Sequence, residues 1–207
     1  MVARTSTRPS TNGSSSGRRR TSRAPSDAIA LLKADHRTVE KVFRDFERSS
    51  ETAHKTRRKL VDEMIAELSV HAAVEEQFLY PAARRAAPQL ESDVLEAVEE
   101  HHVVKWLLSE LERSDPTDEW FTPKVTVLME NVRHHVRKEE HELFPALRSA
   151  MDRVELRDLG VRLAEGKRLA PTHPHPRLPD TPPGNLIAGA VSGAIDKARD
   201  KVSARVR

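Results

Sequence analysis

The sequence predicts an all-α protein built as an up-down-up-down four-helix bundle, with a tail at each end. Three observations favour this fold class. Glycine occurs 7 times in 207 residues, whereas the good helix formers Ala, Leu, Glu and Arg are abundant. Apolar residues recur at alternating steps of three and four in four long segments, which is the spacing of one buried helix face. The connections between the segments are short, so neighbouring helices should run antiparallel.

Two helices are expected in the first half of the chain. The first runs to about Arg48 and has Ser26 as its N-cap, because a serine side chain can accept hydrogen bonds from the first turn. Its inward stripe is Leu32, His36, Val39, Phe43 and Phe46. The second runs from about Thr52 to Arg85, and its inward stripe is Leu60, Met64, Leu68, His71, Glu75 and Phe78.

Two further helices complete the expected bundle. The third runs from about Leu90 to Glu112, with an inward stripe of Val94, Ala97, His101, Val104, Leu108 and Leu111. The fourth begins near Pro123, since proline suits the first turn of a helix. Its inward stripe is Val125, Leu128, Val132, His135, Glu139 and Ala146.

The ends of the chain differ from its middle in charge, although the formal net charge is only +3. Residues 1–26 hold six Arg and no acidic residue, residues 27–166 hold 21 basic and 29 acidic residues, and residues 167–207 hold eight basic and three acidic residues. We expect a disordered basic tail over 1–26, because it has few large apolar residues to bury, and the folded bundle over 27–166. Residues 167–207 are expected to form a Pro-rich linker, Pro171 to Pro183, and a short helix from about Asn185 to Arg205.

Composition excludes several classes of protein. The chain has no Cys, which rules out disulfide scaffolds, thiol catalysis and thiolate metal sites. No apolar run approaches the ~18 residues of a membrane span, and no apolar stretch follows Arg18, Arg19 and Arg20 as an export signal requires. We therefore expect a cytoplasmic protein without a membrane partner. We interpret the arginine-rich tail as solubilising, with nucleic-acid binding through it as the alternative; the sequence leaves the oligomeric state open.

Histidines and glutamates interrupt the apolar stripes in a repeated pattern. His71 to Ala86 aligns with His135 to Ala150 with eight of sixteen positions identical. More faintly, the Asp-His pair at 35–36 aligns with the Glu-His pair at 100–101. Burying six ionisable side chains is costly unless something pairs with them. The two hairpins should thus face each other around a pseudo-twofold polar site.

The repeat also separates the inward histidines from the others. It selects His101 rather than its neighbour His102, and it places His134 and His141 off the inward face. His54 lies in the expected connection between the first two helices and has no repeat mate. Two remaining histidines, His173 and His175, lie in the Pro-rich linker without a third ligand nearby in the sequence.

The selected residues have the chemistry of a metal site. Residues four apart on a helix reach into one cavity, so each repeat supplies a His and a Glu, and the other two helices supply one His each. Mixed nitrogen and oxygen ligation without sulfur suits Fe, Mn or Zn. Two metal ions, bridged by the two carboxylates and each flanked by two histidines, would use all six candidates. We expect iron rather than Mn or Zn. The candidate ligands are His36, His71, Glu75, His101, His135 and Glu139.

At these residues the chain resembles the hemerythrin-like, or H-H-E cation-binding, family. The motifs that carry the resemblance are Asp35-His36, His71-x-x-x-Glu75-Glu76 before Leu79-Tyr80-Pro81, Glu100-His101, and His135-x-x-x-Glu139-Glu140 before Leu143-Phe144-Pro145. The resemblance implies a four-helix bundle around a non-haem di-iron centre. It also implies a small ligand such as oxygen, nitric oxide or peroxide.

The chain departs from the oxygen-carrying members of that family. Lys105 stands where they have a second third-helix histidine, and an ammonium cannot coordinate a metal. They use an acidic residue that corresponds to Glu140, whereas the internal repeat favours Glu139; Glu40, whose repeat mate is Lys105, is left out of the ligand set. Asp35 and Glu100 are either acceptors for ligand N–H groups or exposed charges.

These departures weaken reversible oxygen storage as a function. Our first hypothesis is a di-iron protein that binds, senses or reacts with oxygen, peroxide or nitric oxide, and enzymatic turnover stays open. The alternative is a metal-stabilised binding or regulatory module, or a protein that stores or senses iron without turnover. A plain bundle without metal is disfavoured by the inward polar repeat.

Overall fold

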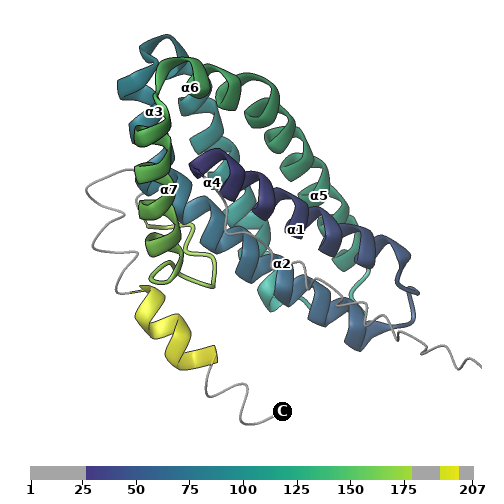
Figure 1. Ribbon diagram of the computed structural model, residues 1–207. Coiled ribbons are helices and arrows are strands. Elements are labelled where there is room, and N and C mark those ends of the chain that lie inside the picture. The colour runs from purple at the N-terminus through teal and green to yellow at the C-terminus, as the bar shows by residue number, and fades with distance from the viewer. Residues whose placement is uncertain (1–26, 179–191, 201–207) are drawn as a thin grey trace, which may run out of the picture.

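The computed structural model describes residues 27–178 and 192–200 (Figure 1). The basic tail, the part of the expected linker beyond residue 178 and parts of the expected C-terminal helix lie outside the described residues. Within them the chain is helical and contains no strand, which confirms the all-α prediction. The elements in chain order are α1 (Ala28–Arg48), α2 (His54–Val74), the π-helical turn η1 (Glu75–Leu79), α3 (Tyr80–Ala86), the 3₁₀ turn η2 (Pro88–Leu90), α4 (Glu91–Arg113), α5 (Phe121–Lys138), the π-helical turn η3 (Glu139–Leu143), α6 (Phe144–Ala150) and α7 (Arg153–Lys167).

Among the described residues these elements form four long arms, and α7 is a further helix packed beside them (Figure 1). The arms are α1, then α2 with η1 and α3, then α4, then α5 with η3 and α6. Neighbouring arms pack as α1 on α2, α2 on α4 and α4 on α5, while α7 packs on α1, α2 and η1. The short helix over residues 192–200 follows the gap after residue 178.

Two expected helix starts are displaced. The N-cap of α1 is Asp27 rather than Ser26: its Oδ1 accepts a hydrogen bond from the backbone N–H of Ala30 at 2.9 Å. A carboxylate at this position is as effective a cap as a serine hydroxyl and also interacts favourably with the positive end of the helix dipole. α5 begins at Phe121, so that Pro123 still lies in the first turn, where its missing N–H leaves no bond broken.

The two π-helical turns interrupt the second and fourth arms at equivalent places in the repeat. In each, a backbone N–H bonds to the carbonyl five residues earlier, from Tyr80 to Glu75 and from Phe144 to Glu139. A π turn takes in one more residue than an α turn, so the buried stripe shifts by one position beyond it. Phe78 and Ala146 are therefore only half-buried, and their expected core places are taken by Leu79, Tyr80, Leu143, Phe144 and Leu147.

The helix α7 was not among the four expected. A complete capping box starts it: the Asp152 side chain accepts from the N–H of Glu155 at 2.9 Å, and the Glu155 side chain accepts from the N–H of Asp152 at 2.8 Å. The Asp-x-x-Glu spacing is a sequence signal that predicts a helix start. Gly160 brings α7 close to α1, because an added Cβ would lie 2.8 Å from the backbone N of Ala28.

The core consists of two hydrophobic clusters with a polar layer between them. The first contains Ile29, Leu32 and Val94 among its members, and the second contains Val39, Met64 and Val104 among its members. Each long helix crosses from one cluster to the other, and its inward histidine lies at the crossing. Among the described residues, no helix is both long enough and apolar enough to span a membrane.

Candidate metal centre

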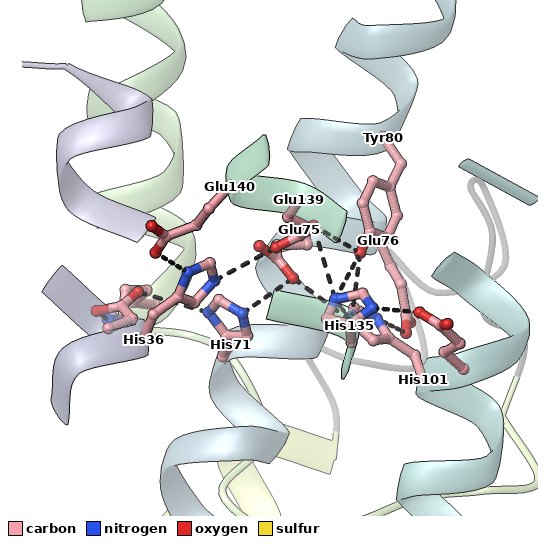
Figure 2. A network of polar contacts seen from close by, with 12 residues as sticks. His36, His71, Glu75, Glu76, Tyr80, His101, His135, Glu139 and Glu140 are labelled. Carbon is pink, nitrogen blue, oxygen red and sulfur yellow. Dashed lines mark hydrogen bonds and ion pairs between the residues drawn. The ribbon is translucent and has the colours of Figure 1, made fainter. Parts of the chain in front are cut away.

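Six polar side chains from all four arms meet between the two hydrophobic clusters (Figure 2). Each is at most 6% exposed. They are the six residues that the repeat singles out in the sequence: His36, His71, Glu75, His101, His135 and Glu139. Figure 2 shows the two glutamates in the middle, with His36 and His71 on one side and His101 and His135 on the other.

The six side chains form two overlapping groups, and in each group the potential ligand atoms lie within 4.8 Å of one another. Glu75 belongs to both groups, and Glu139 of the first group also approaches the second, since its Oε1 lies 3.7 Å from Nε2 of His135. This arrangement suits two neighbouring cations that share carboxylates. The first group is His36, His71, Glu75 and Glu139, and the second is Glu75, His101 and His135.

Several of the inward atoms are buried without a hydrogen bond among the described residues. They include Nε2 of His36, Nε2 of His71, both carboxylate oxygens of Glu75 and Oε2 of Glu139. The nearest opposite charges lie at 3.3 Å for His36 Nε2 to Glu139 Oε2 and at 3.1 Å for His71 Nε2 to Glu75 Oε2. Buried polar atoms without a partner are rare in proteins. A cation is a partner that these nitrogen and oxygen atoms can share, so the donor set fits a metal.

A carboxylate lies behind each of the four imidazoles, at Nδ1, on the side away from the centre. At His36, His101 and His135 the carboxylate is close enough to accept the Nδ1 proton, which leaves the Nε2 lone pair directed at the centre, whereas Asp35 lies beyond hydrogen-bond distance of His71. The distances from Nδ1 to the nearest carboxylate oxygen are 2.9 Å for His36 and Glu140, 3.7 Å for His71 and Asp35, 3.0 Å for His101 and Glu76, and 2.7 Å for His135 and Glu100.

These carboxylates obey the same repeat as the histidines. Glu140 and Glu76 are equivalent positions, and so are Asp35 and Glu100. From the sequence, Asp35 and Glu100 could be either supporting acceptors or exposed charges; both are largely buried beside a histidine, at 13% and 22% side-chain exposure. Glu140 lies behind His36 rather than in the ligand set, and Glu76, to which the sequence assigns no role, does the same for His101. The repeated Glu-Glu doublet, with its first member inward, is the signal that points to the second member.

At one position beside the centre, the two halves of the repeat carry different aromatic residues. Tyr80 occupies the place whose repeat mate is Phe144. The Tyr80 hydroxyl donates to Oε1 of Glu139 at 3.1 Å and lies 3.3 Å from Nε2 of His101. Phe144 instead stacks on His36, with ring centroids 5.7 Å apart. The π turn lets residues 75 and 80 both reach the centre, and a phenol hydroxyl therefore stands beside the group with three candidate ligands.

Two further residues discussed from the sequence point away from the centre. Lys105 lies behind His101, where its Nζ donates to Oε2 of Glu76 at 2.7 Å. Glu40 accepts from the guanidinium of Arg133 at 2.9 and 3.1 Å. The first group has four candidate ligands and the second has three. The smaller number in the second group agrees with Lys105 standing where oxygen-carrying family members have another histidine.

The remaining histidines lie outside the cluster. His102 accepts from the indole N–H of Trp106 at 3.1 Å, the side chain of His134 is 57% exposed, and Nδ1 of His141 donates to the carbonyl of Arg137. His54 is the first residue of α2 rather than part of the preceding connection. In the linker, both histidines contact acidic side chains of the 192–200 helix: His173 with Asp200 at 3.0 Å and His175 with Asp196 at 3.1 Å.

Neighbouring charges shift the pKa values of the buried side chains in the cluster. Burial alone would lower the pKa of His71, but the charge of Glu75 and the nearby carboxylate of Asp35 raise it to about 10. Burial alone would raise the pKa of Glu139, but the charge of His135 and the adjacent imidazole of His36 lower it to about 2. Burial and the neighbouring charge of Glu139 raise the pKa of Glu75. The metal-free cluster therefore holds protons that a cation would displace.

His101 and Tyr80 are held in their neutral forms. Burial, the charge of His135 and the charge of Lys105 lower the pKa of His101 well below its usual value. Burial and the charge of Glu139 raise the pKa of the Tyr80 phenol well above its usual value. A neutral imidazole is the form that binds a metal, and a neutral phenol is the form that donates a hydrogen bond.

Comparison with known proteins gives concordant matches. A family model described as the hemerythrin HHE cation binding domain matches residues 27–147. An uncharacterized hemerythrin-like protein of Schizosaccharomyces pombe is 27% identical over 176 residues, which is 84% of each chain. A DNA nickase of Nostoc is 29% identical over 119 residues, 58% of this chain and only 33% of the nickase.

A solved structure is similar as well. The crystal structure of a hemerythrin HHE cation-binding domain-containing protein from Mycobacterium kansasii superposes with a TM-score of 0.58 and 26% sequence identity. The match covers 68% of this chain and 85% of the other. The matched family model ends before α7, whereas the match to the Schizosaccharomyces pombe protein extends beyond it.

Proposed function

Because the chain belongs to the hemerythrin HHE cation-binding domain family, we propose that it is a non-haem di-iron protein that reacts with or senses peroxide, nitric oxide or oxygen. The observation that supports two ions is the position of Glu75, which belongs to both groups of candidate ligands. Iron is proposed over Mn or Zn because paired iron is the common occupant of bundle sites made of carboxylates and histidines.

The proposed ligands divide between the two ions. His36 and His71 would hold the first ion, His101 and His135 the second, with Glu75 and Glu139 between them. A bound iron pair supplies redox chemistry in which two electrons can be exchanged together. The carboxylates behind Nδ1 would orient the four imidazoles, so that Nε2 of each can bind an ion once its proton is displaced.

The second ion is where we propose that an external ligand binds. Three candidate ligands, Glu75, His101 and His135, lie close together there, whereas Glu139 belongs to the first group and only approaches the second. A metal position left to water is one that a small molecule can take. The Tyr80 hydroxyl lies within 3.4 Å of Nε2 of both His101 and His135, so it would donate its hydrogen bond to such a ligand in place of Glu139. Lys105 is held by Glu76, so it supports His101 from behind and does not attract the ligand directly.

One experiment separates the functional alternatives. The full chain is prepared without oxygen, analysed for metal, and examined by optical spectroscopy after separate additions of oxygen, peroxide and nitric oxide. We expect it to consume peroxide, or to bind nitric oxide, faster than metal-free protein or the His101→Ala variant. A stable, reversible oxygen adduct without either reaction would restore an oxygen carrier. A spectrum that none of the three changes, together with stabilisation by the metal, would favour the metal-stabilised module.

A further inference from the structure

The helix over residues 192–200 is attached to the chain by two histidines of the segment that follows α7. Nε2 of His173 lies 3.0 Å from Oδ1 of Asp200, and Nε2 of His175 lies 3.1 Å from Oδ2 of Asp196. Asp196 is only 3% exposed, and it also accepts from the backbone N–H of His173 at 3.2 Å. The two aspartates are four residues apart on the helix, so the same face of the helix carries both contacts.

Backbone contacts give this helix a defined docking place. Gly193 lies so close to the carbonyl oxygen of Leu169 that a side chain at residue 193 would not fit. Nζ of Lys197 donates to the carbonyl oxygen of Arg168. The helix therefore packs directly on the residues at the end of α7, and the histidine contacts hold it there.

His173 joins this helix to the bundle, because a carboxylate lies at each of its two ring nitrogens. Nδ1 contacts Oε1 of Glu112 on α4, and Nε2 contacts Asp200. A neutral imidazole has a single N–H and can donate to only one of two carboxylates, whereas an imidazolium donates to both. The bridge from Glu112 through His173 to Asp200 is therefore complete only while the ring is charged. The contact of His175 with Asp196 needs one N–H, which a neutral ring also supplies.

The charges around His173 favour its protonated form. Burial alone would lower the pKa of His173, but the contacts with Asp200 and Glu112 raise it above its ordinary value. Burial alone would raise the pKa of Asp200, but hydrogen bonds from Thr172 and His173 lower it. Arg199 of the same helix lies 3.7 Å from Oε1 of Glu112. His173 also borders a cavity of about 290 Å³ whose wall includes two acidic and two basic side chains from η1, α4 and α7: Glu76, Glu165, Lys105 and Arg162.

From these contacts we propose that the 192–200 helix is a pH-dependent conformational switch, which is docked on the bundle while His173 is charged and released when the ring loses its proton. A histidine whose pKa is raised in the docked state stabilises that state below its ordinary pKa, and this stabilisation is lost as the pH rises through the raised value. Docking should therefore be complete under mildly acidic conditions and weaken as the solution becomes alkaline. The switch does not involve the candidate metal ligands, so the proposal stands apart from the proposed function.

The test measures the distance between two spin labels on the full chain by pulsed electron paramagnetic resonance. The chain contains no Cys, so Val127→Cys on α5 and Ala198→Cys on the 192–200 helix, both at exposed positions, introduce the two labelling sites. We expect a narrow distance distribution at about pH 6 and a broad one at about pH 9.5, since the ordinary pKa of histidine is ~6.5. The change should reverse when the pH is returned to its starting value.

Three substitutions separate the charge of His173 from other effects of pH. His173→Gln should give the broad distribution already at about pH 6, because a neutral amide cannot replace two charge-assisted hydrogen bonds. His173→Arg keeps its charge at every pH used and should keep the narrow distribution at about pH 9.5. Glu112→Gln removes one of the two carboxylates and should lower the midpoint of release by about one pH unit.

His141→Gln is the matched control, because His141 is an exposed histidine whose Nδ1 donates to the carbonyl of Arg137 four residues earlier. It should leave the pH profile unchanged, and circular dichroism of each variant checks that the bundle is retained. A labelled chain that stays docked at about pH 9.5, or that is already undocked at about pH 6, would overturn the proposal. Release of His173→Arg at the same pH as the chain with His173, or full docking of His173→Gln at about pH 6, would do the same.

Discussion

Removing the carboxylate behind one histidine should weaken one of the two proposed metal ions and spare the other. Glu140 accepts from Nδ1 of His36 at 2.9 Å and its side chain is 28% exposed. Glu76 accepts from Nδ1 of His101 at 3.0 Å and its side chain is only 3% exposed. Loss of such a supporting carboxylate typically costs ~10–100-fold in metal affinity. Water can replace Glu140 but not Glu76.

We therefore expect about tenfold weaker binding of one ion in Glu140→Ala, equivalent to about 1.4 kcal/mol. Glu76→Ala should weaken the other ion more, by about 100-fold. The assay is an anaerobic titration with Fe(II) against a chromophoric chelator, which resolves two dissociation constants. Glu142→Ala is the control, because it removes a carboxylate from the same π turn that contacts no histidine among the described residues. Unchanged affinities in Glu140→Ala, or a larger loss there than in Glu76→Ala, would refute the reasoning.

Three further predictions concern the ligands, pH and the packing of α7. His71→Ala or His135→Ala should lose most of the bound metal, while His102→Ala and His141→Ala retain it; equal metal content in all four would contradict the ligand assignment. Because the pKa of His71 is about 10 in the metal-free chain, binding displaces its proton, and affinity should rise about tenfold per pH unit between about pH 6 and 8; chelator competition that shows no such slope would refute this. Gly160→Ala should lower the free energy of unfolding by about 1–3 kcal/mol in urea denaturation, since an added Cβ would lie 2.8 Å from backbone of α1; an unchanged midpoint would mean that α7 contributes little.

The sequence was most informative where a residue's type conflicts with its position. Histidines on apolar stripes, repeated across the two halves, identify the six side chains that meet in the structure. Local spacing predicts these positions because the segments that carry them are regular α-helix, both in the first arm and in the second arm as far as Glu75.

Local spacing fails beyond the two π turns. The extra residue in each turn moves Tyr80 and Phe144 into the core in place of the residues that α-helical spacing selects, Phe78 and Ala146. A sequence pattern of 3.6 residues per turn contains no information on such an insertion. Pro81 and Pro145 mark the two places, but proline alone does not distinguish a helix end from a π turn.

The partners of the histidines depend on contacts between distant segments. Glu140 meets His36 across 104 positions of the chain, and Glu76 meets His101 across 25. Only the packing of the arms brings these groups together, although the repeated Glu-Glu doublet identifies the positions.

The number of iron ions per chain tests the di-iron proposal most directly. The full chain is loaded with Fe(II) without oxygen, freed of unbound metal by gel filtration, and analysed for iron and protein by mass spectrometry and absorbance. Six candidate ligands in two groups that share Glu75 predict a ratio of about two. A ratio of one or below in fully loaded, folded protein would contradict the account.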